Sequence, residues 1–535
     1  MECHCIRAVD VPRTSRLYSS YLQDFQSVAR YYSHPPTLDS VKRVAAEVRP
    51  DLQTRSKIAE ILRVQNRAFG SDASVDAALD RFASGAAAVV SGQQVGLFSG
   101  PSYTIYKALT ALRLAEELNS SGIPAVAIFW LATEDHDLAE INHCFWPSRE
   151  AIEKIELPSS DYEGHSAGEV PLGDAVLDAV ARATAKLEGP AADQIRSALA
   201  SSYQPSESYG SAFGKLFAKL FAGRGLILLD PLSDGLHRQA EPLYRAALER
   251  HSELNQQLLA RSRELEVAGY HAQVKVTEES VPLFLNVDGK RVPLRARNGD
   301  FAAGPRSFSF YALSDLLAAS PLDFSANALL RPVVQDRLLS TATYVGGPAE
   351  VAYFAQASAY YAALLGRMPV ILPRASFTLV DSHTVRLLPK YDLQFSDVFR
   401  GPAGLREKME GALLPATLTQ RFDRGEKSLQ EMLAELREQV TRLDQTLGGA
   451  MDTAESKMLF QFSKLKEKVG RAVALRSSVL DGHQRELIAQ LYPNGELQER
   501  AHCFLPALAA QGAELLDELM RRIKIGGAQH QVLYL

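Results

Sequence analysis

The stretch Ser91-Gly-Gln-Gln-Val-Gly-Leu-Phe-Ser-Gly-Pro101 lies between an apolar run, residues 86–90, and an amphipathic run, residues 102–118. This order predicts a strand, a glycine-rich loop and a helix. The glycines allow the backbone to turn sharply and to approach a ligand closely, and the N-terminus of the helix would attract an anion. The spacing matches neither the P-loop nor the dinucleotide-binding pattern. A loop that only packs the helix on the sheet is therefore the alternative.

A second apolar run, residues 124–132, ends in Thr133-Glu-Asp-His-Asp137. A continuous apolar run of this length is typical of a parallel strand that is buried on both faces. Ligands of doubly wound sheets bind beyond the carboxyl ends of the strands, so Glu134, Asp135, His136 and Asp137 are the candidate catalytic residues. His136 is a candidate general base, hydrogen-bond donor or metal ligand. The alternative is a capped helix start, in which Thr133 or Asp135 accepts backbone N–H groups.

A third group of polar residues follows later in the chain, from Arg331 to Tyr353 and again after a short predicted strand, residues 369–373. Arg331 is suited to pair with a carboxylate or a phosphate, and Glu350 is suited to bind an amine. A tight turn before a helix, with Glu350 near the helix start, is the alternative. The candidate substrate- or nucleotide-binding residues of all three groups are Ser91, Gly92, Gln93, Gln94, Gly96, Gly100, Pro101, Tyr103, Thr133, Asn142, Arg331, Gln335, Asp336, Tyr344, Gly346, Gly347, Glu350, Tyr353, Arg374 and Ser376.

Composition limits the class of protein. The chain has 535 residues, 46% of them hydrophobic and 23% charged, with a formal net charge of −5. Its length predicts more than one domain, or one domain with large insertions, and its charge favours neither nucleic acid nor a membrane surface. We expect a cytoplasmic protein, because no apolar run reaches transmembrane length, the N-terminus lacks a secretory signal and four cysteines make no disulfide scaffold. No metal site is predicted, and a metal requirement stays open.

The predicted fold is α/β, with a Rossmann-like, mostly parallel sheet, two insertions and a C-terminal α-helical antiparallel coiled-coil hairpin. Residues 225–230 are a candidate third strand. Residues 273–276, 283–287 and 292–294 predict an antiparallel piece that turns at Asp288-Gly289. The predicted domains are a core over residues 1–385, with insertions near 150–205 and 265–325, a coiled coil over 386–500 and a segment over 501–535 that returns to the core.

The C-terminal part carries a heptad pattern. Leu429, Leu433, Leu436, Val440, Leu443 and Leu447 alternate spacings of four and three, which is typical of a coiled coil. Gly448-Gly449 interrupts the pattern, so we predict an antiparallel hairpin that reverses near this pair; one bent helix is the alternative. The leucine stripe predicts a homodimer, since two-fold symmetry is the commonest closure of such a seam.

Several of these stretches together resemble the BshC family over essentially the whole chain. They are residues 91–107, 129–142, 325–336, 343–353, 373–378 and 491–500. The resemblance implies a cysteine ligase that joins cysteine to glucosaminyl-malate in the last step of bacillithiol biosynthesis. It also implies a core similar to the nucleotidyltransferase group that includes class I aminoacyl-tRNA synthetases, although this chain lacks the H-x-G-H element of that group.

Formation of an amide from a free carboxylate needs activation, for which ATP or another nucleotide is the expected cofactor. Gln93 and Gln94 would then hold the anion, His136 or Asp137 would accept the proton, and Arg331 or Arg374 would stabilise charge. Two other classes remain open: a non-catalytic ligand-binding or scaffold protein, and a sugar-nucleotide-dependent transferase.

Overall fold

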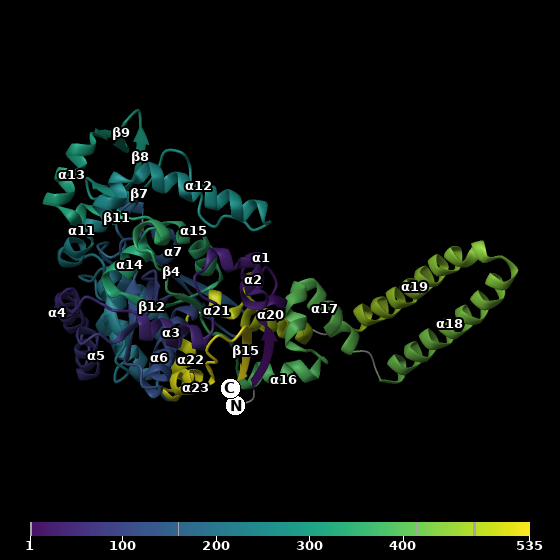
Figure 1. Ribbon diagram of the computed structural model, residues 1–535. Coiled ribbons are helices and arrows are strands. Elements are labelled where there is room, and N and C mark those ends of the chain that lie inside the picture. Colours follow the sequence, from purple (N-terminus) through teal and green to yellow (C-terminus); the bar gives the residue numbers. More distant parts are fainter. Residues whose placement is uncertain (1–2, 159, 414–415, 475–477) are drawn as a thin grey trace.

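The computed structural model describes residues 3–158, 160–413, 416–474 and 478–535 (Figure 1). Its central layer is a five-stranded sheet in which all neighbouring strands are parallel. Across the sheet the order is β13 (Val370–Pro373), β12 (Thr341–Gly346), β2 (Ala87–Gln93), β3 (Ala125–Leu131) and β6 (Ile227–Leu229). The predicted α/β class and the predicted strands of this sheet are confirmed.

Side chains on these strands alternate between two cores. Val89 and Phe129 face one core, whereas Val90 and Ile128 face the other. The first core contains α3 (Leu38–Glu47), α6 (Tyr103–Ser120) and α10 (Tyr209–Leu220), and the second contains α4 (Leu52–Phe69), α5 (Ala73–Ala83), α11 (Asp234–Glu249), α14 (Arg331–Leu339) and α15 (Pro348–Leu364). Since both faces are covered, the strands are almost continuously apolar.

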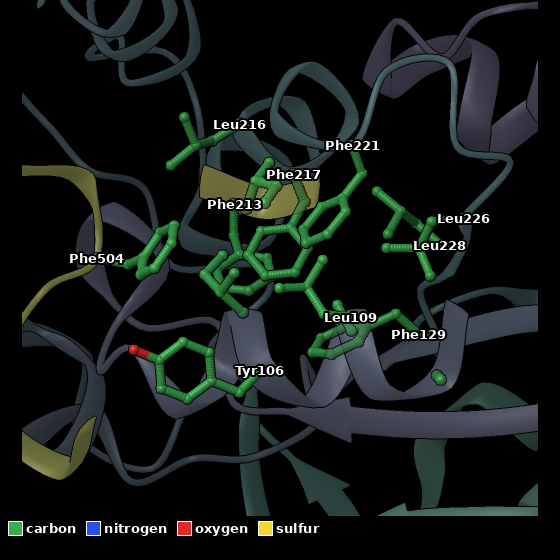
Figure 2. Packing of buried hydrophobic residues seen from close by; sticks show 14 of the residues in the cluster. Tyr106, Leu109, Phe129, Phe213, Leu216, Phe217, Phe221, Leu226, Leu228 and Phe504 are labelled. Atoms are coloured by element: carbon green, nitrogen blue, oxygen red, sulfur yellow. The ribbon is translucent and has the colours of Figure 1, made fainter. Parts of the chain in front are cut away.

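Aromatic rings fill the first core (Figure 2). The ring centroids of Phe213 and Phe217 on α10 lie 4.3 Å apart, and Phe217 lies 5.1 Å from Phe129 of β3. Because each of these rings is fully buried, α10 is held firmly against the sheet.

The chain reverses its direction of travel across the sheet between β2 and β12. From β2 it proceeds through β3 to β6 on one side, and later returns to β12 and β13 on the other side. The carboxyl ends of β2 and β12 therefore flank a topological switch point, where open α/β sheets bind their ligands.

Two insertions interrupt the sheet. The first contains β4 (His143–Pro147), β5 (Ile152–Glu156), α8 (Ala175–Thr184) and α9 (Ala192–Ser202), after the short α7 (Leu138–Ile141). The second contains α12 (His251–Val267), β7 (Ser280–Val287), β8 (Lys290–Arg297), β9 (Asp300–Ala303), β10 (Arg306–Phe308), α13 (Phe310–Ala319) and β11 (Phe324–Ala326).

The second insertion contains an antiparallel sheet in the order β10-β9-β8-β7-β11. The predicted hairpin turn is confirmed, because Val287 pairs with Lys290 around Asp288-Gly289, both of which have positive φ. The predicted strand over residues 273–276 is wrong. The N–H and C=O of Val274 bond to the side chain of Gln356 instead of a neighbouring strand.

The C-terminal part is mostly helical, with α16 (Ser382–Lys390), α17 (Gly401–Ala412), α18 (Ala416–Leu443), α19 (Gly448–Ala474) and α20 (Ser478–Leu491). Helices α18 and α19 run side by side and extend away from the body as a hairpin (Figure 1). The antiparallel hairpin is thus confirmed, with one difference: the reversal lies at residues 444–447, where Asp444 caps the turn, and Gly448-Gly449 begins α19.

After α21 (Gln498–Ala501), α22 (Leu505–Gln511) and α23 (Glu514–Arg522), the chain ends in β15 (Gln529–Tyr534). This strand pairs antiparallel with β1 (Cys3–Arg7) and parallel with β14 (Ser376–Val380), so both ends of the chain lie together (Figure 1). The helices α1 (Arg16–Gln23) and α2 (Phe25–Val28) follow β1. Within the described ranges, no helix combines the length and the apolarity that a membrane crossing requires.

Candidate functional site

A cavity of about 430 Å³ lies at the switch point of the parallel sheet. It collects residues from all three groups that the sequence singles out. The predicted residues that line it are Gly92, Gln93, Gln94, Tyr103, Glu134, Asp135, Arg331, Tyr344, Gly347, Glu350, Tyr353 and Arg374. Segments separated by more than two hundred residues in the sequence therefore meet at one site.

The other predicted residues lie outside this wall. They are Ser91, Gly96, Gly100, Pro101, Thr133, His136, Asp137, Asn142, Gln335, Asp336, Gly346 and Ser376. Most of them bond within the protein: the Ser91 hydroxyl donates to the Val345 carbonyl, and that of Thr133 donates to Asp230 at 2.5 Å. Whether any of them contributes to function stays a prediction.

A buried ion pair forms one side of the cavity. Nζ of Lys107 lies 2.7 Å from a carboxylate oxygen of Glu350 and also donates to the carbonyl of Gly92 and the side chain of Gln93. Glu350 further accepts the hydroxyl of Tyr344 at 2.5 Å and the amide of Gly347 at 2.6 Å. Burial opposes the charge of Glu350, but Lys107 outweighs it and holds the pKa of this carboxyl below its ordinary value. Glu350 lies in the first turn of α15 and also lines the cavity, and its binding of an amine stays a prediction.

Two guanidinium groups in the cavity wall have only neutral hydrogen-bond partners among the described residues. Arg331 donates to Gln335 and Tyr353 and lies over the rings of Trp130 and Tyr344, each 5.8 Å away. Arg291 comes from β8 of the second insertion and donates to neutral groups as well. An anionic ligand group would give both a charged partner.

Acidic residues also line the cavity. Gln94 donates to Asp135 at 2.8 Å and to Glu140 at 2.5 Å, which ties the glycine-rich loop to the loop after β3. Glu134 is buried and lies 3.1 Å from Nε2 of His237. Burial lowers the pKa of His237, but Glu134 more than offsets this, so the pKa is raised overall. The cavity wall thus carries both cationic and acidic side chains.

The start of α6 differs from the anion-binding helix N-terminus that the sequence predicts. The amides of Thr104, Ile105 and Tyr106 at the start of α6 all have backbone acceptors within the chain, and Ser102 donates to the carbonyl of His502. These N–H groups are occupied, so an anion in this cavity would have to be bound by side chains. Gly92 is needed for close packing, since a Cβ atom there would lie 2.7 Å from the carbonyl oxygen of Trp130.

The sequence interpretation missed several residues of the wall, namely Lys107, Trp130, Glu140, Arg291, Asn327 and Arg500. The sequence contained a sign that Lys107 lines the site, because Lys107 lies four residues after Tyr103 on the same helical face. No sequence pattern indicated Arg291. It is an ordinary strand residue of an insertion, and only the tertiary structure brings it to the cavity.

A second cavity, of about 360 Å³, shares Arg374 and Arg500 with the first. Glu499 of α21 binds Arg374 with both carboxylate oxygens, at 2.7 and 3.0 Å. Ser376 lines this second cavity and lies within hydrogen-bond distance of Glu499 and His530. The C-terminal segment therefore forms part of the wall between the two cavities.

Comparison with known proteins agrees with this architecture. Residues 1–375 match the N-terminal Rossmann-like domain of bacillithiol biosynthesis BshC, and residues 377–535 match its C-terminal coiled-coil domain. The chain belongs to the BshC family. Both domains of BshC are present, and the match covers nearly every residue.

Individual BshC proteins resemble the chain over its full length. A relative from Koribacter versatilis is 38% identical over 517 residues, which is 96% of this chain and 97% of that protein. One from Solibacter usitatus is 36% identical over the whole of both chains, and one from Geobacillus thermodenitrificans is 26% identical over 99% of this chain and all of the relative. Each of the three is named "Putative cysteine ligase BshC". The family description connects these proteins with bacillithiol biosynthesis, and the relatives' names connect them with ligation.

Proposed function

We propose that this BshC protein is a ligase that joins L-cysteine to glucosaminyl-malate in the last step of bacillithiol biosynthesis. The names of its relatives support a ligase. The observation that carries the proposal is that one cavity wall holds both the guanidinium groups of Arg291 and Arg331 and the carboxylates of Asp135 and Glu140. The two substrates together bring carboxylates and ammonium groups, which such a cavity would orient.

The anionic groups would bind at the guanidinium groups of Arg291 and Arg331. Since neither has a carboxylate within 4.0 Å among the residues that the structure describes, a ligand would replace neutral partners by a charge-assisted contact. Lys107 is already neutralised by Glu350. We assign to this pair the role of fixing the loop of Gly92 and Gln93.

The attacking amine must lose a proton before it forms the amide. His136 and Asp137 were expected to accept it, but neither lines the cavity, whereas Asp135 does. We therefore place the proton acceptor at Asp135. Its carboxylate is held by Gln94.

Activation of the carboxylate would consume a nucleoside triphosphate, of which ATP is the expected one. It would proceed through an acyl adenylate or an acyl phosphate, and the amine would then displace the phosphate-bearing group. Such a reaction would fit a cytoplasmic protein whose partners are its small-molecule substrates and a second copy of the chain, with no nucleic acid or membrane.

The deciding experiment is mass spectrometry of the purified protein with L-cysteine, glucosaminyl-malate and ATP. We expect a product with the summed mass of the two substrates less one water, and we expect the Arg331→Ala variant to form much less of it. Arg521→Ala, an exposed residue on α23, is the matched control. Consumption of a sugar nucleotide in place of ATP would favour a transferase, and absence of any product with ATP or GTP would contradict the proposal.

A further inference from the structure

His136 does not line the cavity, but it contacts Arg291, which does. Its Nδ1 lies 3.1 Å from Nη1 of Arg291, and its ring centroid lies 5.7 Å from that of Phe284 on β7. Arg291 in turn stacks on Phe284, with its guanidinium carbon 3.8 Å from the ring centre. A residue of the parallel-sheet domain thus meets two residues of the second insertion.

The chemistry of arginine decides which tautomer His136 adopts. A guanidinium can only donate hydrogen bonds. Nδ1 of His136 must therefore accept, and the ring proton must reside on Nε2. With its Nδ1 lone pair occupied by Arg291, this imidazole is poorly placed to take a proton from a substrate in the cavity.

Arg291 is held at three points. Besides His136, its Nε donates to the hydroxyl of Ser325 at 2.8 Å and its Nη2 donates to the carbonyl of Ala326 at 2.7 Å. A guanidinium has five N–H donors, so these contacts leave some of them for a ligand. Ser325 and Ala326 belong to the same insertion as Arg291, and His136 is the contact that fixes Arg291 to the loop after β3.

We propose that His136 is a positioning residue that holds Arg291 of the inserted hairpin where the cavity would bind an anionic group. This inference rests on the proposed function only in that the site takes an anionic group. It assigns Arg291 to substrate binding and removes His136 from the reacting atoms. The insertion then completes a site that the parallel sheet alone leaves open.

The arrangement has a consequence for pH dependence. The charged groups around His136 are Arg291 from β8 and, from its own loop, Asp135, with an oxygen 3.8 Å from Nδ1, and Asp137. Burial and Arg291 lower the pKa of His136 below its ordinary value, against the opposing effect of the two aspartates. Below that pKa, a proton on Nδ1 would face the N–H groups of Arg291 and break the contact. Anion binding should therefore weaken as the pH falls.

The test measures anion binding by calorimetry in the full-length protein, with L-malate and inorganic pyrophosphate as separate probes for a carboxylate and a phosphate ligand. At pH 8, His136→Ala and Arg291→Ala should each weaken the probe that binds by about tenfold, the factor that corresponds to one charge-assisted hydrogen bond. His136→Asn places an amide oxygen near the position of Nδ1 and should restore binding to within about threefold. The double variant His136→Ala/Arg291→Ala should bind no more weakly than Arg291→Ala alone.

His143→Ala is the matched control, because His143 is another half-buried histidine with a lowered pKa and lies outside the cavity wall. Between pH 8 and pH 5, the wild type and the control should lose affinity more steeply than His136→Asn, whose acceptor does not titrate. Thermal melting of each variant separates misfolding from loss of binding.

Unchanged binding in His136→Ala, or equal pH dependence of His136→Asn and the wild type, would overturn the inference, as would failure of the wild type to bind either probe. Failure of ligation alone would not overturn the inference, since the test measures binding and not product formation. If His136→Ala and Arg291→Ala bind the probes normally and ligation persists, the proposed function is supported and this inference is wrong.

Discussion

In the parallel sheet, all residues of β3 and all but the last of β2 are buried, whereas along α18 of the helical hairpin Leu436 and Leu443 remain 45% and 87% exposed. Both regions carry regular apolar patterns in the sequence. The strand pattern is satisfied by helices on both faces of the sheet. The heptad pattern is satisfied only in part, because α19 covers Leu433 but leaves the leucines further along exposed.

This contrast teaches that an apolar pattern identifies a contact surface without identifying its partner. The sheet region is complete within one chain. The hairpin presents apolar surface that a second chain could cover, as the predicted homodimer would require. The following predictions separate the two cases, from the largest expected effect to the smallest.

Shortening a buried side chain in the core of the sheet domain should have the largest effect on stability. Phe217→Ala removes a fully buried ring that packs on Phe213 and Phe129 (Figure 2), and should lower the free energy of unfolding by about 3–5 kcal/mol. Leu443→Ala, on the hairpin, should change the stability of the sheet domain by less than about 0.5 kcal/mol. Urea unfolding of both variants measures the difference. Equal losses would show that the two regions unfold as one cooperative unit.

The junction between the two regions should respond next. Glu499→Gln breaks the buried pair with Arg374 and leaves an uncompensated guanidinium, so we expect a loss of about 3 kcal/mol. Glu496→Gln is the control, because its contact with Arg500 is 3.6 Å long and largely exposed. A loss of similar size in both variants would mean that burial of Glu499 matters little.

The same junction should weaken in acid. His502 is buried, its ring nitrogen bonds to the carbonyl of Ala489, and burial lowers its pKa to about 4. Only the unfolded chain then takes the proton near the ordinary pKa of 6.5, so stability should be intact above pH 6.5 and fall between pH 6.5 and 4. His502→Gln keeps a donor for Ala489 without titrating. Between pH 7 and 4.5 the wild type should lose about 2 kcal/mol more than this variant, and parallel losses in urea unfolding would contradict the assignment.

The smallest effect on the sheet domain should come from the exposed stripe. Leu436→Gln with Leu443→Gln should split a homodimer, so that light scattering shows half the wild-type mass, while the near-UV spectrum of Trp130 and Trp146 stays unchanged. Leu177→Gln on α8, a leucine that is 52% exposed, should leave the mass unaltered. If the wild type is already a monomer at micromolar concentration, the stripe does not form a dimer seam and the prediction is wrong.

Local patterns were sufficient to predict much of this fold. The strands β2, β3, β6 and β13 and the helical hairpin were each visible in a short window of sequence. Hydrophobic periodicity and glycine placement act over few residues, so they are legible without the rest of the chain. The predicted strand over residues 273–276 is wrong because of a residue outside that window. The side chain of Gln356 forms the backbone hydrogen bonds that a neighbouring strand would have formed.

By itself, the sequence determined that polar residues follow β2, β3 and β13, and hence that these segments would meet at the carboxyl edge of a parallel sheet; it did not predict the strand β12. Only the tertiary structure decided which side chains enter the cavity. It turned His136 toward Arg291, covered the start of α6 with His502, and brought Arg291 to the cavity from a segment with no recognisable motif. The physical reason is that burial and charge pairing depend on contacts between residues far apart in the chain, which no local pattern encodes.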